Sequence, residues 1–208
     1  MKTKTKALIL AVCAVLLVVT TVFATVAFLT STATVTNTFT FGKVAITLDE
    51  TDVDVAGAPI AGAARVIENE YHLLPGHEYT KDPTIHVAAG SENCWLFVKL
   101  DNGLKEIIDS ANAKTVEAQM AENGWTLLEG SANVYWYGNV AAATNNIPVF
   151  GSFKIKGEIT NDVIGGYGDA KIVVVAYAVQ ADGFTSKATP AENAKDAWTA
   201  AQRAGNIQ

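Results

Sequence analysis

The side chains best suited to chemistry are three histidines, two of which lie only five positions apart in the sequence. Imidazole is a common zinc ligand, so His72, His77 and His86 are candidate ligands of a zinc site. The zinc-protease pattern His-Glu-x-x-His is absent, however, and Pro75-Gly76 prevents a continuous helix between His72 and His77. The sequence therefore favours the alternative, in which the histidines lie at strand ends and in a turn.

Other catalytic patterns are missing from the sequence. It contains no Gly-x-Ser-x-Gly turn that would present a nucleophilic serine, and no glycine-rich phosphate loop. Cys94 lies in an apolar stretch, where thiols are usually unreactive packing groups. We therefore predict a protein that is not an enzyme and that needs no cofactor.

Two further groups of residues suggest binding. Four acidic residues could hold calcium loosely: Asp49, Glu50, Asp52 and Asp54. They lack the spacing of a calcium loop, so a solvated acidic face is the favoured interpretation. The aromatic run at 135–137 could stack on carbohydrate, but residues alternate between the two faces of a strand. We therefore expect a buried Trp136 with Tyr135 and Tyr137 on the opposite side.

Composition limits the class of protein. The 208 residues are enough for one domain with a hydrophobic core. Acidic residues outnumber basic ones by 21 to 15, and Lys2, Lys4 and Lys6 precede a hydrophobic run, which leaves 12 basic residues for the rest. Such an acidic chain is unsuited to nucleic acid and to anionic lipid. Because Cys13 lies in the hydrophobic run, Cys94 would have no partner in a mature domain, and the fold must depend on core packing.

The N-terminus is typical of an exported protein. Three lysines are followed by an apolar stretch, 7–29, that is interrupted only by threonines. This pattern predicts a signal peptide over 1–27, cleaved between Ala27 and Phe28, where Thr25 and Ala27 are the small residues that a peptidase requires. A second candidate site follows Ala33. The stretch is also long enough for an uncleaved membrane anchor, and both interpretations place the remaining chain outside the cytoplasm.

The segment 28–41 has a strict two-residue period. Every even position from Thr30 to Thr40 is threonine, and the odd positions include most of its apolar side chains: Leu29, Ala33, Val35, Phe39 and Phe41. Period two predicts a β-strand. The strand could be the first of an ordinary sandwich, or it could lack a partner in its own chain and add to the sheet of a neighbouring copy. An ice-binding face would require stacked threonine rows, and no internal repeat supplies them.

The remaining chain predicts a mainly β fold, a jelly-roll-like β-sandwich over 42–208 with short helical insertions and a C-terminal helix. Strands are expected at 65–73, 79–82, 85–88, 94–100, 125–128, 134–140, 148–155 and 171–179, the last being the most buried. Short helices are expected at 103–110 and 114–122, and loops at 49–64 and 161–169. Thr189, Pro190 and Glu192 form a capping box that begins a helix running to about Ala204.

These residues resemble the TasA/camelysin family of Gram-positive bacterial proteins, which are exported with a SipW-type signal peptide. The similar stretches are the long export signal, Thr-Asn-Thr-Phe-Thr-Phe-Gly-Lys-Val at 36–44, Leu-Pro-Gly-His-Glu-Tyr-Thr-Lys-Asp-Pro at 74–83, and Ala-Tyr-Ala-Val-Gln at 176–180 with Trp198. The resemblance implies a jelly-roll domain, cleavage at Ala27–Phe28 by a dedicated signal peptidase, and fibre assembly by donation of the N-terminal strand. Camelysin has been classed as a metallopeptidase, but no ligand motif carries over to this sequence.

Together these observations predict a secreted structural protein of the extracellular matrix, or biofilm, that forms head-to-tail homopolymers. Its expected partners are other copies of itself, other matrix or cell-surface proteins, and the signal peptidase during export, with no nucleic acid. Two alternatives from other classes stay open. One is a camelysin-like zinc peptidase, and the other is a monomeric binding module at the cell surface.

Overall fold

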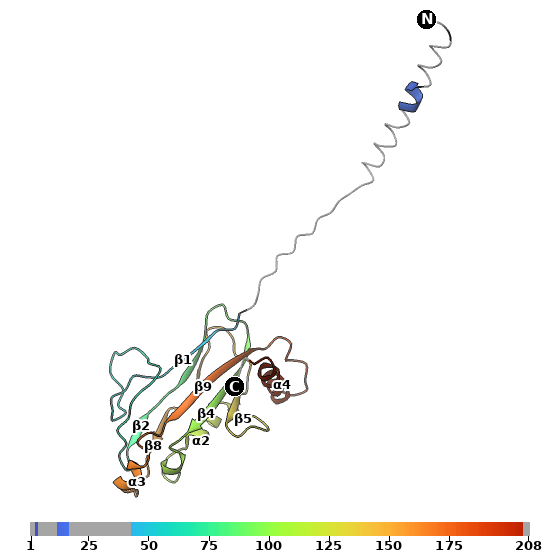
Figure 1. Cartoon of the computed structure of the whole chain (residues 1–208). Coiled ribbons are helices and arrows are strands. Elements are labelled where there is room, and N and C mark those ends of the chain that lie inside the picture. Colours follow the sequence, from blue (N-terminus) through green and yellow to red (C-terminus); the bar gives the residue numbers. More distant parts are fainter. Residues whose placement is uncertain (1–2, 4–11, 17–42, 206–208) are drawn as a thin grey trace. The chain divides into compact units, whose positions relative to one another are not determined.

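The computed structural model describes residue 3, residues 12–16 and residues 43–205 (Figure 1). The chain divides into two units, 1–41 and 42–208. In the first unit the described residues are helical, and Val12, Val15 and Leu16 are more than half exposed. The predicted cleavage site at Ala27–Phe28 and the predicted strand 28–41 lie outside the described residues. None of the helices that the structure describes has the length and apolar character needed to cross a bilayer.

The second unit is mainly β and antiparallel. Its described residues form three sheets. The first has the order β1 (Ile46–Asp49), β3 (Thr84–Val87), β7 (Asn146–Pro148), and the second has the order β5 (Trp125–Leu127), β6 (Val134–Tyr137), β4 (Cys94–Asn102), β9 (Ile172–Gln180). A two-stranded sheet pairs β2 (Glu78–Thr80) with β8 (Ser152–Lys154). The helices are short except the last: η1 (Lys105–Ile107), α2 (Val116–Glu122), α3 (Asn161–Gly165) and α4 (Pro190–Arg203).

β4 is the central strand, as the sequence predicted for 94–100. Its first five residues are all buried, because both faces of the strand are covered. Leu96 and Val98 belong to the larger core cluster, which contains Phe153. Trp95 and Phe97 belong to a second cluster that α4 completes. The apolar character of both faces of β4 thus reflects two separate cores.

α4 begins and ends where its sequence signals place it. The Thr189 hydroxyl accepts a hydrogen bond from the Glu192 N–H at 3.2 Å, and the Glu192 carboxylate accepts one from the Thr189 N–H at 3.0 Å. Helical residues end at Arg203, before Gly205 with its positive φ of 71°. The buried face of α4 packs Trp198 against Phe97, with ring centroids 5.0 Å apart. α4 is therefore a fixed support beside β4 and β9.

Four predicted elements differ from the structure. The helix expected at 103–110 is only the short 3-10 helix η1, which covers Lys105–Ile107. Residues 65–73 do not form a strand. Val66 makes an isolated bridge to Glu50, the His72 N–H donates to the Val55 carbonyl, and the side chains of Asn69 and Tyr71 make further hydrogen bonds. The predicted strand 148–155 is divided between β7 and β8, since the Val149 N–H donates to the Pro83 carbonyl as the chain leaves one sheet for the other. The predicted loop 161–169 contains α3, whose first turn is capped by the Thr160 hydroxyl.

Candidate assembly site at the edge of β9

β9 is an outer strand among the described residues, which corrects the prediction that 171–179 is the most buried strand. All nine of its residues pair with β4, from Ile172 opposite Asn102 to Gln180 opposite Cys94. On its other side no described strand is paired with it. Val173 and Val175 are 41% and 39% exposed. A continuous apolar run usually indicates a strand whose two faces are both buried. It does not show whether that strand lies inside the sheet or at its edge, where a further strand could pair with it.

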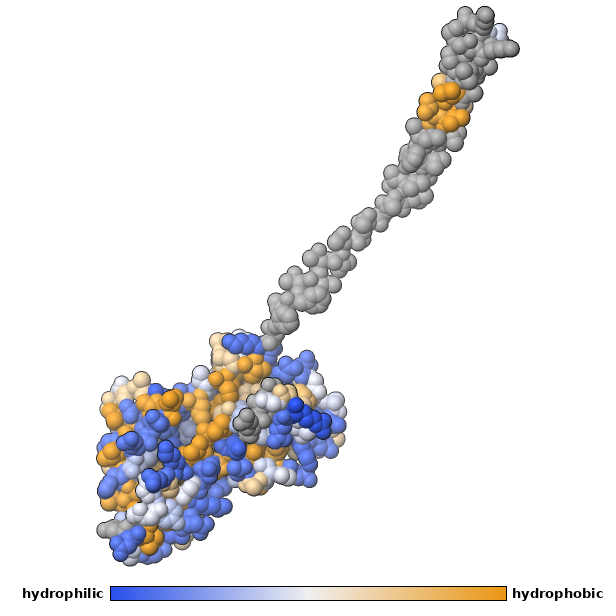
Figure 2. Space-filling view, in the orientation of Figure 1, coloured by the Kyte–Doolittle hydropathy of each residue, from blue (hydrophilic) through white to orange (hydrophobic). Residues whose placement is uncertain are grey.

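The sequence of β9 lacks the residues that usually block pairing at a sheet edge. Its sequence Ile-Val-Val-Val-Ala-Tyr-Ala-Val-Gln contains no proline and no charged residue. Long, exposed, apolar edges readily pair with another strand, and soluble proteins usually block them with lysine, proline or a bulge. Figure 2 shows an apolar band across the middle of the face on which β9 lies. The edge therefore has the character of an acceptor for an added strand.

An apolar groove of about 420 Å³ lies beside the C-terminal half of β9. Its α4 side is formed by the small residues Ala200, Ala201 and Ala204, and Tyr177 and Val179 of β9 line it as well. Small side chains on the helix leave space that larger ones would fill. The groove can consequently accept bulky apolar side chains of a strand that pairs with β9.

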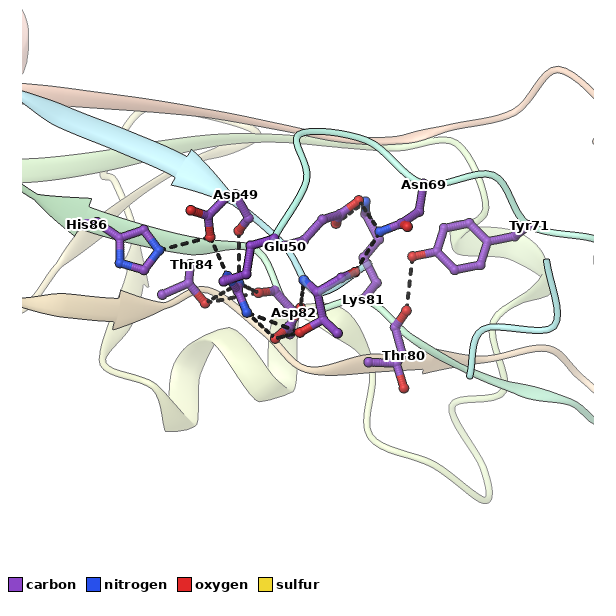
Figure 3. Close-up of polar contacts among 11 residues, drawn as sticks. Asp49, Glu50, Asn69, Tyr71, Thr80, Lys81, Asp82, Thr84 and His86 are labelled. Carbon is purple, nitrogen blue, oxygen red and sulfur yellow. Dashed lines mark hydrogen bonds and ion pairs between the residues drawn. The ribbon is translucent and has the colours of Figure 1, made fainter. Parts of the chain in front are cut away.

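A polar cluster anchors the long loop that connects β1 to β2 (Figure 3). The Arg65 guanidinium pairs with the Asp49 carboxylate, and it donates to the Asp82 carboxylate at 3.0 Å and to the Thr51 and Thr84 hydroxyls at 3.1 Å each. Asp49 ends β1, and Asp82 precedes β3. One arginine therefore joins the loop to two neighbouring strands.

A buried ion pair lies next to this cluster (Figure 3). Lys81 Nζ donates to Glu50 Oε2 at 2.7 Å, and Glu50 is almost completely buried. The Asn69 amide donates to Glu50 Oε1 at 3.0 Å and to the Thr51 carbonyl at 2.9 Å, while its oxygen accepts from the Val53 N–H. Because the Glu50 carboxylate is satisfied by Lys81 and Asn69, it is tolerated in the interior.

Replacing Lys81 with methionine is expected to destabilise the fold, because it leaves the buried Glu50 carboxylate without its counter-ion. Removing one member of a buried pair typically costs about 3–5 kcal/mol. Lys195→Met, which breaks the exposed pair with Glu129, is the matched control and should leave the free energy of unfolding nearly unchanged, because water screens an exposed pair. Urea denaturation measures both variants, and equal losses would contradict the assigned role of Lys81.

The cluster also shifts the pKa values of His86, Asp49 and Asp82. Hydrogen bonds to Asn146 at 2.6 Å and to Asp49 at 2.9 Å raise the pKa of His86. Burial opposes ionisation of Asp49, but hydrogen bonds from Arg65 and His86 outweigh it and lower the pKa. Burial likewise opposes ionisation of Asp82, and hydrogen bonds from the Thr51 N–H and from Arg65 lower its pKa on balance.

We expect the free energy of unfolding to be greatest in mildly acidic solution. The raised pKa of His86 gives stability that is complete below about pH 6.5 and is lost as the pH rises through the folded-state value. The lowered pKa values of Asp49 and Asp82 give stability above about pH 4 that is lost on further acidification. Urea denaturation between pH 3 and pH 8 measures this profile. His86→Gln should remove the decline on the alkaline side, and an unchanged decline would contradict it.

The structure does not bring the three histidines together. His72 is exposed, His77 Nε2 lies 2.8 Å from the Ala56 carbonyl, and His86 contacts Asp49 and Asn146. Within the residues that the structure describes, no group of three or more His, Cys, Asp or Glu side chains is arranged to hold a metal ion. The histidines contact main-chain and side-chain groups of the loop and of β1, β3 and β7.

Three of the four acidic residues considered for calcium are engaged with the chain itself. Asp49 pairs with Arg65 and His86, and Glu50 pairs with Lys81. The Asp54 carboxylate accepts hydrogen bonds from two main-chain N–H groups that follow it, each at 2.9 Å. The sequence could not identify Arg65 as the partner of Asp49 or Lys81 as the partner of Glu50, because these residues are far apart in the sequence and meet only in the folded chain.

The remaining sequence candidates are packed as expected. Burial raises the pKa of the Cys94 thiol to about 11, so little thiolate forms at neutral pH. Trp136 is buried in the cluster that includes α4, whereas Tyr135 and Tyr137 are partly buried against the other cluster. The aromatic run is therefore divided between two cores and presents no flat binding platform.

The residues predicted to form the donor strand, Leu29, Ala33, Val35, Phe39 and Phe41, lie outside the described residues. The described candidate is thus the acceptor side alone, made of the β9 edge and the adjoining groove. The sequence did not reveal this acceptor side, because 171–179 was interpreted as a strand buried inside a sheet. Comparison with known proteins gave no match to any family model, any curated protein or any solved structure.

Proposed function

We propose that this chain is an exported structural protein that polymerises outside the cell by strand addition. In this proposal the segment 28–41 of one copy pairs with β9 of the next. The observation that supports it most strongly is the nine-residue apolar edge of β9, which has one strand partner among the described residues. An edge of this kind readily pairs with an added strand, and the segment 28–41, which is predicted to be a strand, is long enough to cover it.

The composition of the segment 28–41 suits an added strand. Its even positions, Thr30 to Thr40, are β-branched and tolerate exposure on a pleated surface. Its odd positions include Leu29, Val35 and Phe39, which would point to one face. Nine strand residues span about 30 Å, so the segment is long enough to follow β9 from end to end.

The groove between β9 and α4 gives this pairing a source of specificity. Main-chain hydrogen bonds supply affinity for any added strand, and side-chain pockets select one sequence. The groove of about 420 Å³ is wide enough for aromatic or branched apolar side chains. Phe39 and Phe41 are the largest apolar residues with the required alternate spacing, and we assign them, with Leu29 and Val35, as anchors.

Strand donation from one copy to the next is a head-to-tail contact, which does not close on itself and therefore produces fibres. The proposal includes a signal peptide over 1–27, a jelly-roll arrangement of the described sheets, and secretion to the extracellular or biofilm matrix, in agreement with the resemblance to the TasA/camelysin family. It assigns no catalytic role to the chain.

The proposal is tested by purifying the chain that begins at Phe28 and following it by electron microscopy and sedimentation. We expect fibres that lengthen with time and concentration. Separately, when the full 208-residue chain is expressed and secreted, N-terminal sequencing of the secreted protein should identify Phe28 as the first residue. A protein that remains monomeric across pH, salt and concentration would contradict the proposed function.

A further inference from the structure

The tip of the β1–β2 loop is an uncharged projection on an acidic protein. Residues 55–64, here called the apolar tip, read Val-Ala-Gly-Ala-Pro-Ile-Ala-Gly-Ala-Ala and include no polar side chain. All of them except Gly57 are exposed, with Val55 at 60% and Ile60 at 46%. The whole loop runs from 50 to 77 without a named helix or strand, and loops of this length are usually functional.

The apolar tip is held rigidly from both ends. The Asp54 carboxylate accepts from the N–H groups of Ala56 and Ala58, and the Ile60 N–H donates to the Asp52 carbonyl at 2.9 Å. The Thr80 N–H donates to the Gly57 carbonyl at 3.2 Å, which ties the tip to β2.

Gly57 has a φ of +78°, and a Cβ there would lie 2.8 Å from the Tyr79 ring and 2.9 Å from its Cα. The glycine therefore allows the tip to lie directly on β2. Because the loop is already ordered, a partner that binds its exposed side chains would lose little conformational entropy.

Charge limits the kind of partner that the tip can accept. The tip is flanked in the sequence by acidic residues, whose carboxylates repel the head groups of anionic lipids: Asp52, Asp54, Glu68 and Glu70. The chain that begins at Phe28 has 12 basic and 21 acidic residues, a formal charge of −9. Two copies of it repel each other, and they can approach most closely through a surface without charge. Among the residues that the structure describes, the apolar tip is a surface of this kind.

The size of the tip sets the strength of the contact. Ten residues can bury a few hundred Å² at most, whereas stable interfaces bury about 1,200–2,000 Å². A contact this small is weak between two monomers. It becomes effective where many copies are arrayed along a polymer, because the contacts then act together.

We propose that the apolar tip is a lateral contact between copies of this chain, which packs tip against tip and joins neighbouring fibres into bundles. This inference depends on the proposed function for the array of copies. Since the contact is apolar and its surroundings are acidic, it strengthens with ionic strength. Salt screens repulsion between the flanking carboxylates beyond about 10 Å at 0.1 M, whereas a contact with a basic partner would weaken.

The test compares wild-type fibres with the variants Ile60→Asp and Val55→Asp, using Val163→Asp as the matched control. Val163 is 47% exposed on α3, away from the loop in sequence. Electron microscopy should show single fibres of normal length for the two tip variants, and bundles for wild type and Val163→Asp. Bundling that persists in both tip variants overturns the proposal, and so does bundling that declines between 0.05 and 0.5 M sodium chloride.

A second arm separates this inference from the proposed function. The chain that begins at Phe28 is attached densely to beads through an N-terminal biotin, which occupies the donor end. Tip contacts should cluster wild-type and Val163→Asp beads, and clustering by Ile60→Asp beads should fall at least tenfold. If wild-type protein forms no fibres but its beads cluster through Ile60, the proposed function fails and the tip contact holds. Clustering that is independent of Ile60 removes the tip contact.

Discussion

A chain that begins at Thr38 is expected to remain a folded monomer at concentrations where the chain that begins at Phe28 forms fibres. The truncation deletes Leu29 and Val35, two of the four assigned anchors. Burial of a leucine or valine side chain contributes about 1.5–3 kcal/mol, so losing two such side chains should weaken association by about 10²–10⁴-fold, before the lost main-chain bonds are counted. Sedimentation velocity measures the loss.

The fold should survive this truncation, because all fully buried residues of the two core clusters lie between Tyr79 and Ala201. Circular dichroism and urea denaturation provide the check. A full-length control carries Leu29→Asp and Val35→Asp, which keeps the segment but removes its apolar anchors. Fibres formed by either protein at the wild-type rate would show that 28–37 is not the donor.

Val175→Lys is expected to abolish assembly from the acceptor side while leaving the domain folded. Val175 is exposed on β9, so the substitution should change the free energy of unfolding by about 0.5 kcal/mol or less. A lysine on an edge strand opposes pairing because the incoming strand must bury or displace its charge. Val163→Lys places the same charge on the exposed side of α3 and should assemble normally. Fibre growth is followed by light scattering and electron microscopy.

The two defective proteins should complement each other. Val175→Lys retains the donor segment, and the chain that begins at Thr38 retains the β9 edge. Each alone should be monomeric, and their mixture should give a one-to-one heterodimer by analytical ultracentrifugation, with no larger species. A mixture that stays monomeric would contradict the assignment of donor and acceptor to different parts of the chain.

Local signals in the sequence predicted most of the fold. The capping box at Thr189 fixed the start of α4, and the two-faced apolar run from Cys94 identified the central strand. The burial of β9 was predicted wrongly because an apolar run does not show whether a strand has neighbours on one side or on both. α3 was missed because three glycines in 161–169 concealed a threonine cap.

The polar cluster could not be predicted, for a different physical reason. Arg65 meets Asp49 and Asp82 from 16 and 17 positions away, through a loop without regular periodicity. The periodicity of helices and strands predicts which residues a few positions apart share a face. It does not predict which distant residues a long irregular loop will contact. The acidic stretch from Asp49 therefore appeared to be a solvated face, whereas Glu50 is one of the most buried charged groups described.

Hydrogen exchange of the β9 main chain tests the central claim most directly. The amides of Ile172–Gln180 are compared by mass spectrometry between fibres of the chain that begins at Phe28 and the monomer that begins at Thr38. β5 (Trp125–Leu127), at the opposite end of the same sheet, is the internal reference. We predict that exchange slows in β9 on assembly and changes little in β5. Fibres in which β9 exchanges as fast as it does in the monomer would contradict strand addition at this edge.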